Sequence, residues 1–290
     1  MFAKVTAEYV RPGLTRLGYY SRPTFLIIGT QKGGTVALRK YLARHQNIVP
    51  ARQKEIGYFD QDISYGRGAR WYHGHFPLPH RLGRRGVTFE ATPEYLYYPK
   101  AAQRIWSYDP GLKLIALLRE PVERAFSAWN MFRTLRYEHP EYLRAILPEC
   151  DPELRQSISQ MLAGHSFPEF DRAVRDEIAG LLSASSPLEP GYVRRGLYQE
   201  QLLRYLEWFA REQILVLDSA RLKTDLGNVL PEVVRFLGLP EYAALPVGLP
   251  PLHVGRYEQP IAESTRGFLR EFYKPHNATL YELLGRDFGW

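Results

Sequence analysis

Short apolar runs alternate with amphipathic segments along most of the chain. Four runs are mainly apolar and four to six residues long, which is typical of strands buried on both faces: Thr24–Ile28, Val87–Glu90, Lys113–Leu118 and Gln213–Asp218. Helical periodicity follows in Gly34–Arg44, from Pro121 onward, and in Gly196–Ala210, Leu226–Leu237 and Ser264–Leu284. Because strands alternating with helices form parallel sheets, the pattern predicts an α/β fold whose central parallel sheet is flanked by helices.

The pattern also predicts the domain organisation. Residues 1–22 form a basic, aromatic lead-in without a clear period, and residues 23–290 are expected to form a single domain. Proline and serine punctuate the segment after residue 140, so that about 135–190 is interpreted as a variable helical insert.

The composition limits the ligands, metals and cellular compartments that are expected for this chain. The chain has 38 basic and 31 acidic residues, a net charge of +7 that suits an anionic ligand, but no Lys/Arg block indicates nucleic acid. A single cysteine, Cys150, excludes a disulfide within the chain and a cysteine-based zinc site, and no HExxH pattern occurs, so we expect no metal. With no apolar stretch long enough to span a bilayer, the default expectation is a cytoplasmic protein.

The stretch FLIIGTQKGGTVALRKYL, Phe25–Leu42, runs from a predicted strand through a glycine-rich turn into a helix. Such a turn presents backbone N–H groups and the positive end of the helix dipole to an anion, and Lys32 and Thr35 add a charge and a hydroxyl. The lysine lies two residues before Gly34, whereas nucleotide loops of the GxxxxGK[ST] type place it directly after the glycine. The sequence therefore predicts an anion held without a required metal, and a plain turn with a surface lysine is the alternative.

Several ordered motifs resemble sulfotransferases that use 3′-phosphoadenosine-5′-phosphosulfate (PAPS), particularly the heparan sulfate glucosaminyl 3-O- and N-sulfotransferases. The resemblance implies a P-loop nucleotide-kinase-like sulfotransferase fold and transfer of a sulfuryl group from PAPS, with 3′-phosphoadenosine-5′-phosphate (PAP) as product. The motifs are PTFLIIGTQKGGTVAL, KEIGYFD, WYHGHFP, FEATPEYLYYP, LLREPVERAFSAW, GLYQEQLLRYLEWF, QILVLDSARL and LLGRDFGW.

The resemblance assigns the donor site residue by residue. It implies that Lys32 neutralises charge on the transferring group and that Gly33, Gly34 and Thr35 cradle the 5′-phosphate. The 3′-phosphate would be held by Arg119, at a strand end, and by Ser127 in the next helix, although Arg119 could instead pair with Glu120 or Glu123. A nucleotide-covering loop would use Gly255 and Arg256, although Val254 stands where the family has a lysine.

The acceptor side is less sharply defined. The resemblance makes Glu55, in KEIGYFD, the catalytic general base, and we expect partial burial to raise its pKa; a salt bridge with Lys54 or Arg52 is the alternative. Asp60 matches an acidic cleft residue, and Glu90 is a candidate second carboxylate or a structural strand-end residue. Val36 and Ala91 stand where the 3-O-sulfotransferases have an arginine and a lysine, which predicts an acceptor that is neutral or weakly charged near its hydroxyl.

Two other functions share some of these features. A P-loop NTPase or small-molecule kinase would have the same strand, loop and helix, with Asp218 as its magnesium-binding residue. A polyanion-binding module would account for the net charge and would have no use for Glu55. On the sulfotransferase reading, the acceptor is a hydroxyl rather than an amine, on a small molecule, a carbohydrate or a carrier-bound chain.

Overall fold

The computed structural model describes residues 15, 17–83, 86–164, 166–183, 190–246, 257 and 259–290. The chain divides into two compact units that are interleaved along the sequence. The first, here called the sheet unit, comprises Met1–Leu118 and Arg204–Leu252, and the second, the helical unit, comprises Arg119–Leu203 and His253–Trp290.

All five strands pair in parallel in the order β2-β3-β1-β4-β5, which confirms the predicted α/β class. Their bounds are β1 Phe25–Gly29, β2 Ile48–Pro50, β3 Val87–Ala91, β4 Lys113–Leu118 and β5 Ile214–Asp218. The sequence pattern missed only β2, because it has three residues and ends in a proline, which is tolerated at the edge of a sheet. β2 and β3 lie on one side of β1, and the later strands β4 and β5 lie on the other side. Open α/β sheets bind ligands at the point where the strand order reverses in this way, which here is the end of β1.

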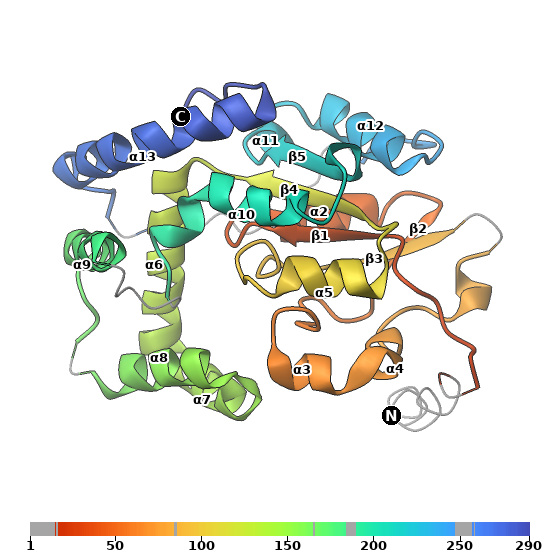
Figure 1. Ribbon diagram of the computed structural model, residues 1–290, viewed down its shortest axis with the longest axis horizontal. Coiled ribbons are helices and arrows are strands. Elements are labelled where there is room, and N and C mark those ends of the chain that lie inside the picture. The colour runs from red at the N-terminus through yellow and green to blue at the C-terminus, as the bar shows by residue number, and fades with distance from the viewer. Residues whose placement is uncertain are drawn as a thin grey trace. The chain divides into compact units, whose positions relative to one another are not determined.

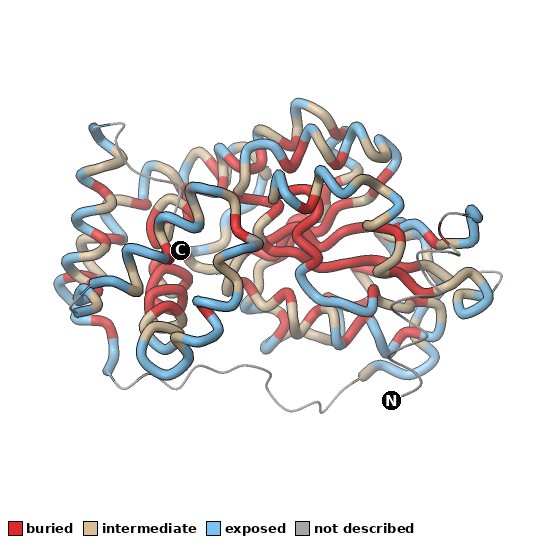
Figure 2. The backbone as a smooth tube through the Cα atoms, turned by 90° about the horizontal axis from the view of Figure 1, so that it is seen from below, coloured by how far each residue is buried: buried red, intermediate tan, exposed pale blue. Residues whose placement is uncertain are grey.

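Helices cover the sheet and bury β1 completely (Figure 1). Phe25, Ile27 and Ile115 of the strands pack against Leu38 of α2 and Val233 of α12 in one apolar core. In Figure 2 the strands are mostly buried, and further buried residues lie along the helices. The helices of this unit are α2 Thr35–Leu42, α3 Asp62–Gly66, α4 Gly68–His73, α5 Ala101–Tyr108, α11 Arg221–Thr224 and α12 Leu226–Leu237, with 3₁₀ turns at Pro79–Arg81 and Arg211–Gln213.

The helical unit begins where β4 ends. Its first helix, α6 at Pro121–Glu138, has proline at its first position and is capped by Glu120, whose carboxylate accepts the Glu123 N–H at 2.6 Å. Phe126 and Trp129 of α6 pack in a second apolar core with Val174 and Tyr273. The other elements are α7 Pro140–Ile146, α8 Pro152–Ala163, α9 Phe170–Leu182, α13 Glu263–Leu284, most of α10 Tyr198–Leu206, and 3₁₀ turns at Leu147–Glu149 and Arg194–Gly196.

Candidate functional site

The loop after β1, which the sequence analysis proposed as an anion cradle, has left-handed backbone at two positions. Lys32 has a φ of 66°, which is rare for a residue other than glycine, and Gly34 has a φ of 92° immediately before α2. The Thr30 N–H donates to the Leu117 carbonyl at 2.8 Å, and the Gly33 N–H donates back to the Thr30 carbonyl at 2.9 Å. The loop is therefore a tight turn tied to β4, and the half-buried Lys32 lies at its tip.

Position 33 needs a glycine because a side chain would not fit there, and not because of its backbone φ angle. A Cβ atom on Gly33 would lie 2.6 Å from the Leu117 carbonyl oxygen and 2.9 Å from that of Thr30. Both obstacles are backbone atoms within hydrogen-bonded structure, so neither can move aside cheaply.

We expect Gly33→Ala to lower the free energy of unfolding by about 1–3 kcal/mol, because the added methyl overpacks the turn. Chemical denaturation measures the change. The control is Gly227→Ala, since Gly227 lies in α12 with no atom within 4 Å of an added Cβ. Gly227→Ala should leave the free energy of unfolding unchanged or raise it by about 0.5–1 kcal/mol. If Gly33→Ala were as stable as wild type, the packing account would be contradicted.

Glu55 lies in an unusual backbone conformation, but it is not buried as the sequence analysis expected. Its φ is 55°, and its N–H donates to the Ala91 carbonyl at the end of β3 at 3.2 Å. The side chain is 46% exposed and forms an ion pair with Lys54. The expectation of partial burial was wrong because the left-handed turn directs Glu55 outward and buries the apolar residues after it.

Glu90 forms the centre of a buried polar cluster that the sequence analysis did not foresee. Its carboxylate accepts hydroxyl hydrogen bonds from Tyr72 at 2.8 Å, Thr92 at 2.7 Å and Tyr95 at 2.7 Å, and it also accepts the Ile56 N–H. Burial raises the pKa of Glu90, although these donors oppose the shift. Glu90 thus has the structural role that was left open, and it anchors the segment that carries Glu55.

The other predicted acceptor residues differ in burial. Ala91 is fully buried in the core of the sheet unit, and Glu90 is fully buried as well. Asp60 is also buried, at 5% exposure, whereas Val36 is half-buried in the first turn of α2.

Arg119 and Ser127 both belong to the helical unit. Arg119 directly follows β4, and its guanidinium lies 3.9 Å from the Glu123 carboxylate, at the outer limit of an ion pair. Arg266 holds the other oxygen of Glu123 at 2.6 Å, and the Glu120 carboxylate caps α6. Arg119 thus makes the ion pair with Glu123 that the sequence analysis gave as the alternative to phosphate binding. Ser127 is buried in the second turn of α6.

Two further predictions concern the covering loop and metals. Val254, Gly255 and Arg256 lie outside the described residues. Within the part of the chain that the structure describes, no group of three His, Cys, Asp or Glu residues could hold a metal ion. No described helix is long and apolar enough to cross a membrane.

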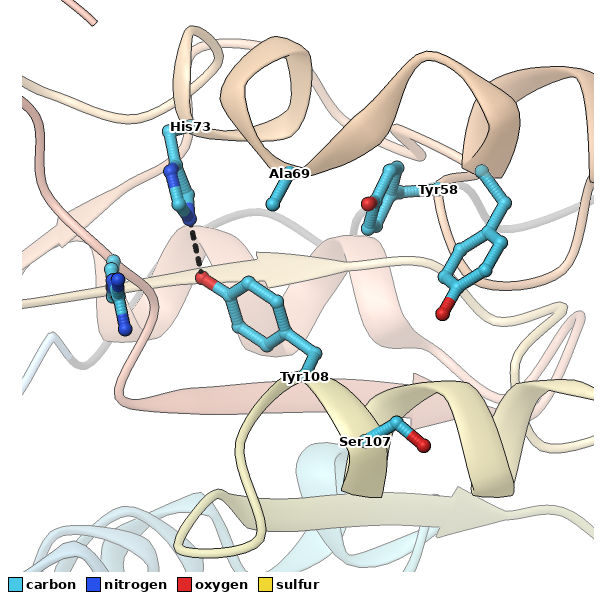
Figure 3. A pocket seen from close by; sticks show the side chains of 7 residues that line it. Tyr58, Ala69, His73, Ser107 and Tyr108 are labelled. Carbon is cyan, nitrogen blue, oxygen red and sulfur yellow. Dashed lines mark hydrogen bonds between the residues drawn. The ribbon is translucent and has the colours of Figure 1, made fainter.

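A cavity of about 280 Å³ opens in the sheet unit between α4 and the end of α5 (Figure 3). Tyr58, Ala69, His73 and Tyr108 line it, and a His73 ring nitrogen lies 2.9 Å from the Tyr108 hydroxyl oxygen. Burial lowers the pKa of His73 to about 4, so the imidazole is neutral near pH 7. The sequence motifs assigned no function to this cavity.

Comparison with known proteins agrees with the resemblance drawn from the motifs. Residues 22–245 match the family model of the sulfotransferase domain. The membrane-associated sulfotransferase kil1 of Dictyostelium discoideum is 28% identical over 92% of this chain and 66% of its own length. The heparan sulfate glucosamine 3-O-sulfotransferase 3B1 of Mus musculus is 30% identical over 92% of this chain and 65% of its own length.

A solved structure extends the likeness to the fold. The crystal structure of a sulfotransferase from Alicyclobacillus acidocaldarius aligns with a TM-score of 0.61 and 27% identity, over 92% of this chain and 97% of that one. The family model covers all five strands, the turn after β1, and the positions of Glu55, Arg119 and Ser127. The chain spans less than two thirds of the length of these curated relatives. It nevertheless belongs to the sulfotransferase family, because the family model matches most of it.

Proposed function

We propose that the protein transfers a sulfuryl group from PAPS to an acceptor hydroxyl by in-line displacement. The acceptor oxygen attacks sulfur and forms a new S–O bond while the bond from sulfur to the bridging oxygen of PAPS breaks. The electron pair of the broken bond stays on the 5′-phosphate of PAP, and the acceptor proton goes to Glu55. The observation that carries the proposal is the turn after β1, where Lys32 and Gly34 have left-handed backbone directly before α2.

Positioning and charge stabilisation supply most of the catalysis in such a reaction, as in the related loose phosphoryl transfers. In this proposal the turn formed by Gly33, Gly34 and Thr35 cradles the 5′-phosphate. The N–H groups of Gly34 and Thr35 donate to it, because the Gly33 N–H already donates to the Thr30 carbonyl. The Lys32 ammonium neutralises the charge that develops on the leaving oxygen. The backbone strain at Lys32 supports a functional role, because such conformations cluster at ligand-binding sites.

Glu55 shares this strained backbone geometry, and it is the carboxylate that we assign as general base. The ion pair with Lys54 engages its Oε1 atom, so we assign the acceptor proton to Oε2. Glu90 cannot take the role in this structure, because its carboxylate is fully buried and already accepts three hydroxyl hydrogen bonds.

The 3′-phosphate of the donor would be held by Arg119 and Ser127. A guanidinium can bind a phosphate through two parallel hydrogen bonds, which a lysine cannot do, and the serine hydroxyl adds another donor. Arg119 directly follows β4, and the carboxyl ends of parallel strands are where open α/β sheets bind ligands.

The kinase or NTPase alternative relied on Asp218 as a magnesium ligand. Asp218 ends β5, an edge strand separated from β1 by β4, and its Oδ1 accepts the Ala220 N–H at 2.9 Å in a local turn. A turn-capping role accounts for this residue, so the geometry favours sulfuryl transfer over phosphoryl transfer.

We also propose that the acceptor is neutral or weakly charged near the reacting hydroxyl. Neither Val36, in the first turn of α2, nor the buried Ala91 supplies the cation that the resemblance places at its position. Two lost charge-assisted contacts, at about 1.5–3 kcal/mol each, would weaken an acidic acceptor by about 10²- to 10⁴-fold.

An acceptor assay with PAPS tests this proposal. Heparan sulfate and a panel of neutral hydroxyl compounds are compared at equal concentration, with sulfated products read by mass spectrometry. We expect product from neutral acceptors and little from the polyanion. Efficient sulfation of heparan sulfate that falls steeply with added salt would show that cations such as Arg39, Arg52 or Arg70 replace the missing pair.

A PAPS-dependent screen of mixed metabolite pools tests the reaction class itself. Each product should gain the mass of one sulfuryl group, and PAP should accumulate in equal amount. If ATP with Mg²⁺ gave phosphorylated products and PAPS gave none, the kinase reading would replace this proposal.

A further inference from the structure

Tyr198, the first residue of α10, makes a hydrogen bond that the donor-site motifs do not include. It is 1% exposed, and its hydroxyl donates to the backbone carbonyl of Arg119 at 2.7 Å. Burial raises the pKa of Tyr198, so the hydroxyl stays protonated and acts as a permanent donor near pH 7.

The carbonyl of Arg119 lies at a point where the backbone changes from strand to helix. Arg119 follows the last residue of β4, and Pro121 starts α6. The first hydrogen bond of the helix runs from the Arg124 N–H to the carbonyl of Glu120, so it does not reach the carbonyl of Arg119. The Tyr198 hydroxyl therefore provides an anchor that the helix itself does not give to this peptide.

Tyr198 is itself firmly held in the helical unit. The fully buried Arg124 donates to the carbonyls of Gly191 and Tyr192, in the segment that leads to α10. The ring of Tyr198 packs edge-on against Trp290, with ring centroids 6.0 Å apart. A buried donor that is held in place by packing can fix the backbone that it contacts.

We infer that Tyr198 is a positioning residue that orients Arg119 toward the 3′-phosphate of the nucleotide. The inference rests on the proposed function, since it takes Arg119 as the ligand of that phosphate. Tyr198 does not touch the nucleotide in this account. Its hydrogen bond reduces the freedom of the Arg119 backbone, so that less conformational entropy is lost when the guanidinium binds the phosphate.

The experiment compares Tyr198→Phe with Tyr273→Phe. Tyr273 is a matched control: it is also 1% exposed in the helical unit, and its hydroxyl donates to the carbonyl of Val193 at 2.8 Å. Each variant keeps its ring and loses one buried hydrogen bond. Calorimetry measures the affinity for PAP and for adenosine 5′-phosphosulfate, which lacks the 3′-phosphate.

We expect Tyr198→Phe to weaken PAP binding by about 3- to 10-fold, which corresponds to one net hydrogen bond, and to leave adenosine 5′-phosphosulfate unchanged. Tyr273→Phe should preserve the ratio of the two affinities. In an Arg119→Ala background, Tyr198→Phe should have no further effect on PAP, because the group through which it acts is gone.

The outcomes separate the two claims. If wild type binds PAP and both tyrosine variants change the two affinities equally, Tyr198 is only structural and the inference is overturned while the proposed function stands. The same conclusion follows if the effects of Tyr198→Phe and Arg119→Ala add. Failure of the wild type to bind PAP would overturn the proposed function, and this inference with it.

Discussion

Glu55→Gln is expected to reduce turnover with the true acceptor by about 10²-fold or more and to leave PAP affinity close to that of wild type. The amide keeps the size and the exposed position of the side chain but cannot accept the acceptor proton. Single-turnover kinetics with PAPS measure the chemical step, and calorimetry measures donor binding. Unequal effects on the two would identify Glu55 as a residue of the chemistry rather than of the donor site.

A matched control for this variant is Glu212→Gln, which alters another exposed carboxylate of the sheet unit and should leave turnover unchanged. If Glu55→Gln kept most of its rate, another group would be the base. His75 would then be the next candidate, because the Glu90 carboxylate is fully buried and accepts three hydroxyl hydrogen bonds.

Lys32→Ala and Arg119→Ala should each weaken PAP binding by about 10- to 150-fold, since each removes a charge-assisted contact of about 1.5–3 kcal/mol. Their selectivities should differ. Lys32→Ala should weaken adenosine 5′-phosphosulfate as well, whereas Arg119→Ala should affect only the nucleotide that carries a 3′-phosphate.

The control for Lys32 is Lys40→Ala, which removes an exposed cation from the last turn of α2. It lowers the net charge by the same amount, so it measures the general electrostatic contribution to anion binding. Equal weakening by Lys40→Ala and Lys32→Ala would mean that the turn after β1 is not the phosphate site.

The fold was largely predictable because its strands are short apolar runs. Lys113–Leu118 and Leu226–Leu237 have the predicted bounds, and most other elements differ by a few residues. Among the described elements, the sequence analysis missed β2 and the helices α3, α4 and α5, all between the first and third predicted strands, and the short helix α11 after β5. α3 has only five residues, and such elements take their structure from packing rather than from a periodic pattern of their own.

The sequence could propose a set of site residues but not their geometry. The motifs identified Lys32 and Glu55, yet nothing in the sequence showed that both have left-handed backbone or that Glu55 is exposed. Burial of Glu90 among three hydroxyls depends on residues up to 18 positions away. Tyr198 stands in the motif GLYQEQLLRYLEWF, but only the structure shows that its hydroxyl reaches the carbonyl of Arg119.

The most direct test of the central claim is a calorimetric titration of PAP into the protein in the presence of EDTA. The position of Lys32, before Gly34 rather than after it, predicts micromolar or tighter binding that EDTA does not weaken. ATP with Mg²⁺, titrated in the same way without EDTA, should bind more weakly. Absence of PAP binding, or binding that requires a divalent metal, would contradict the account.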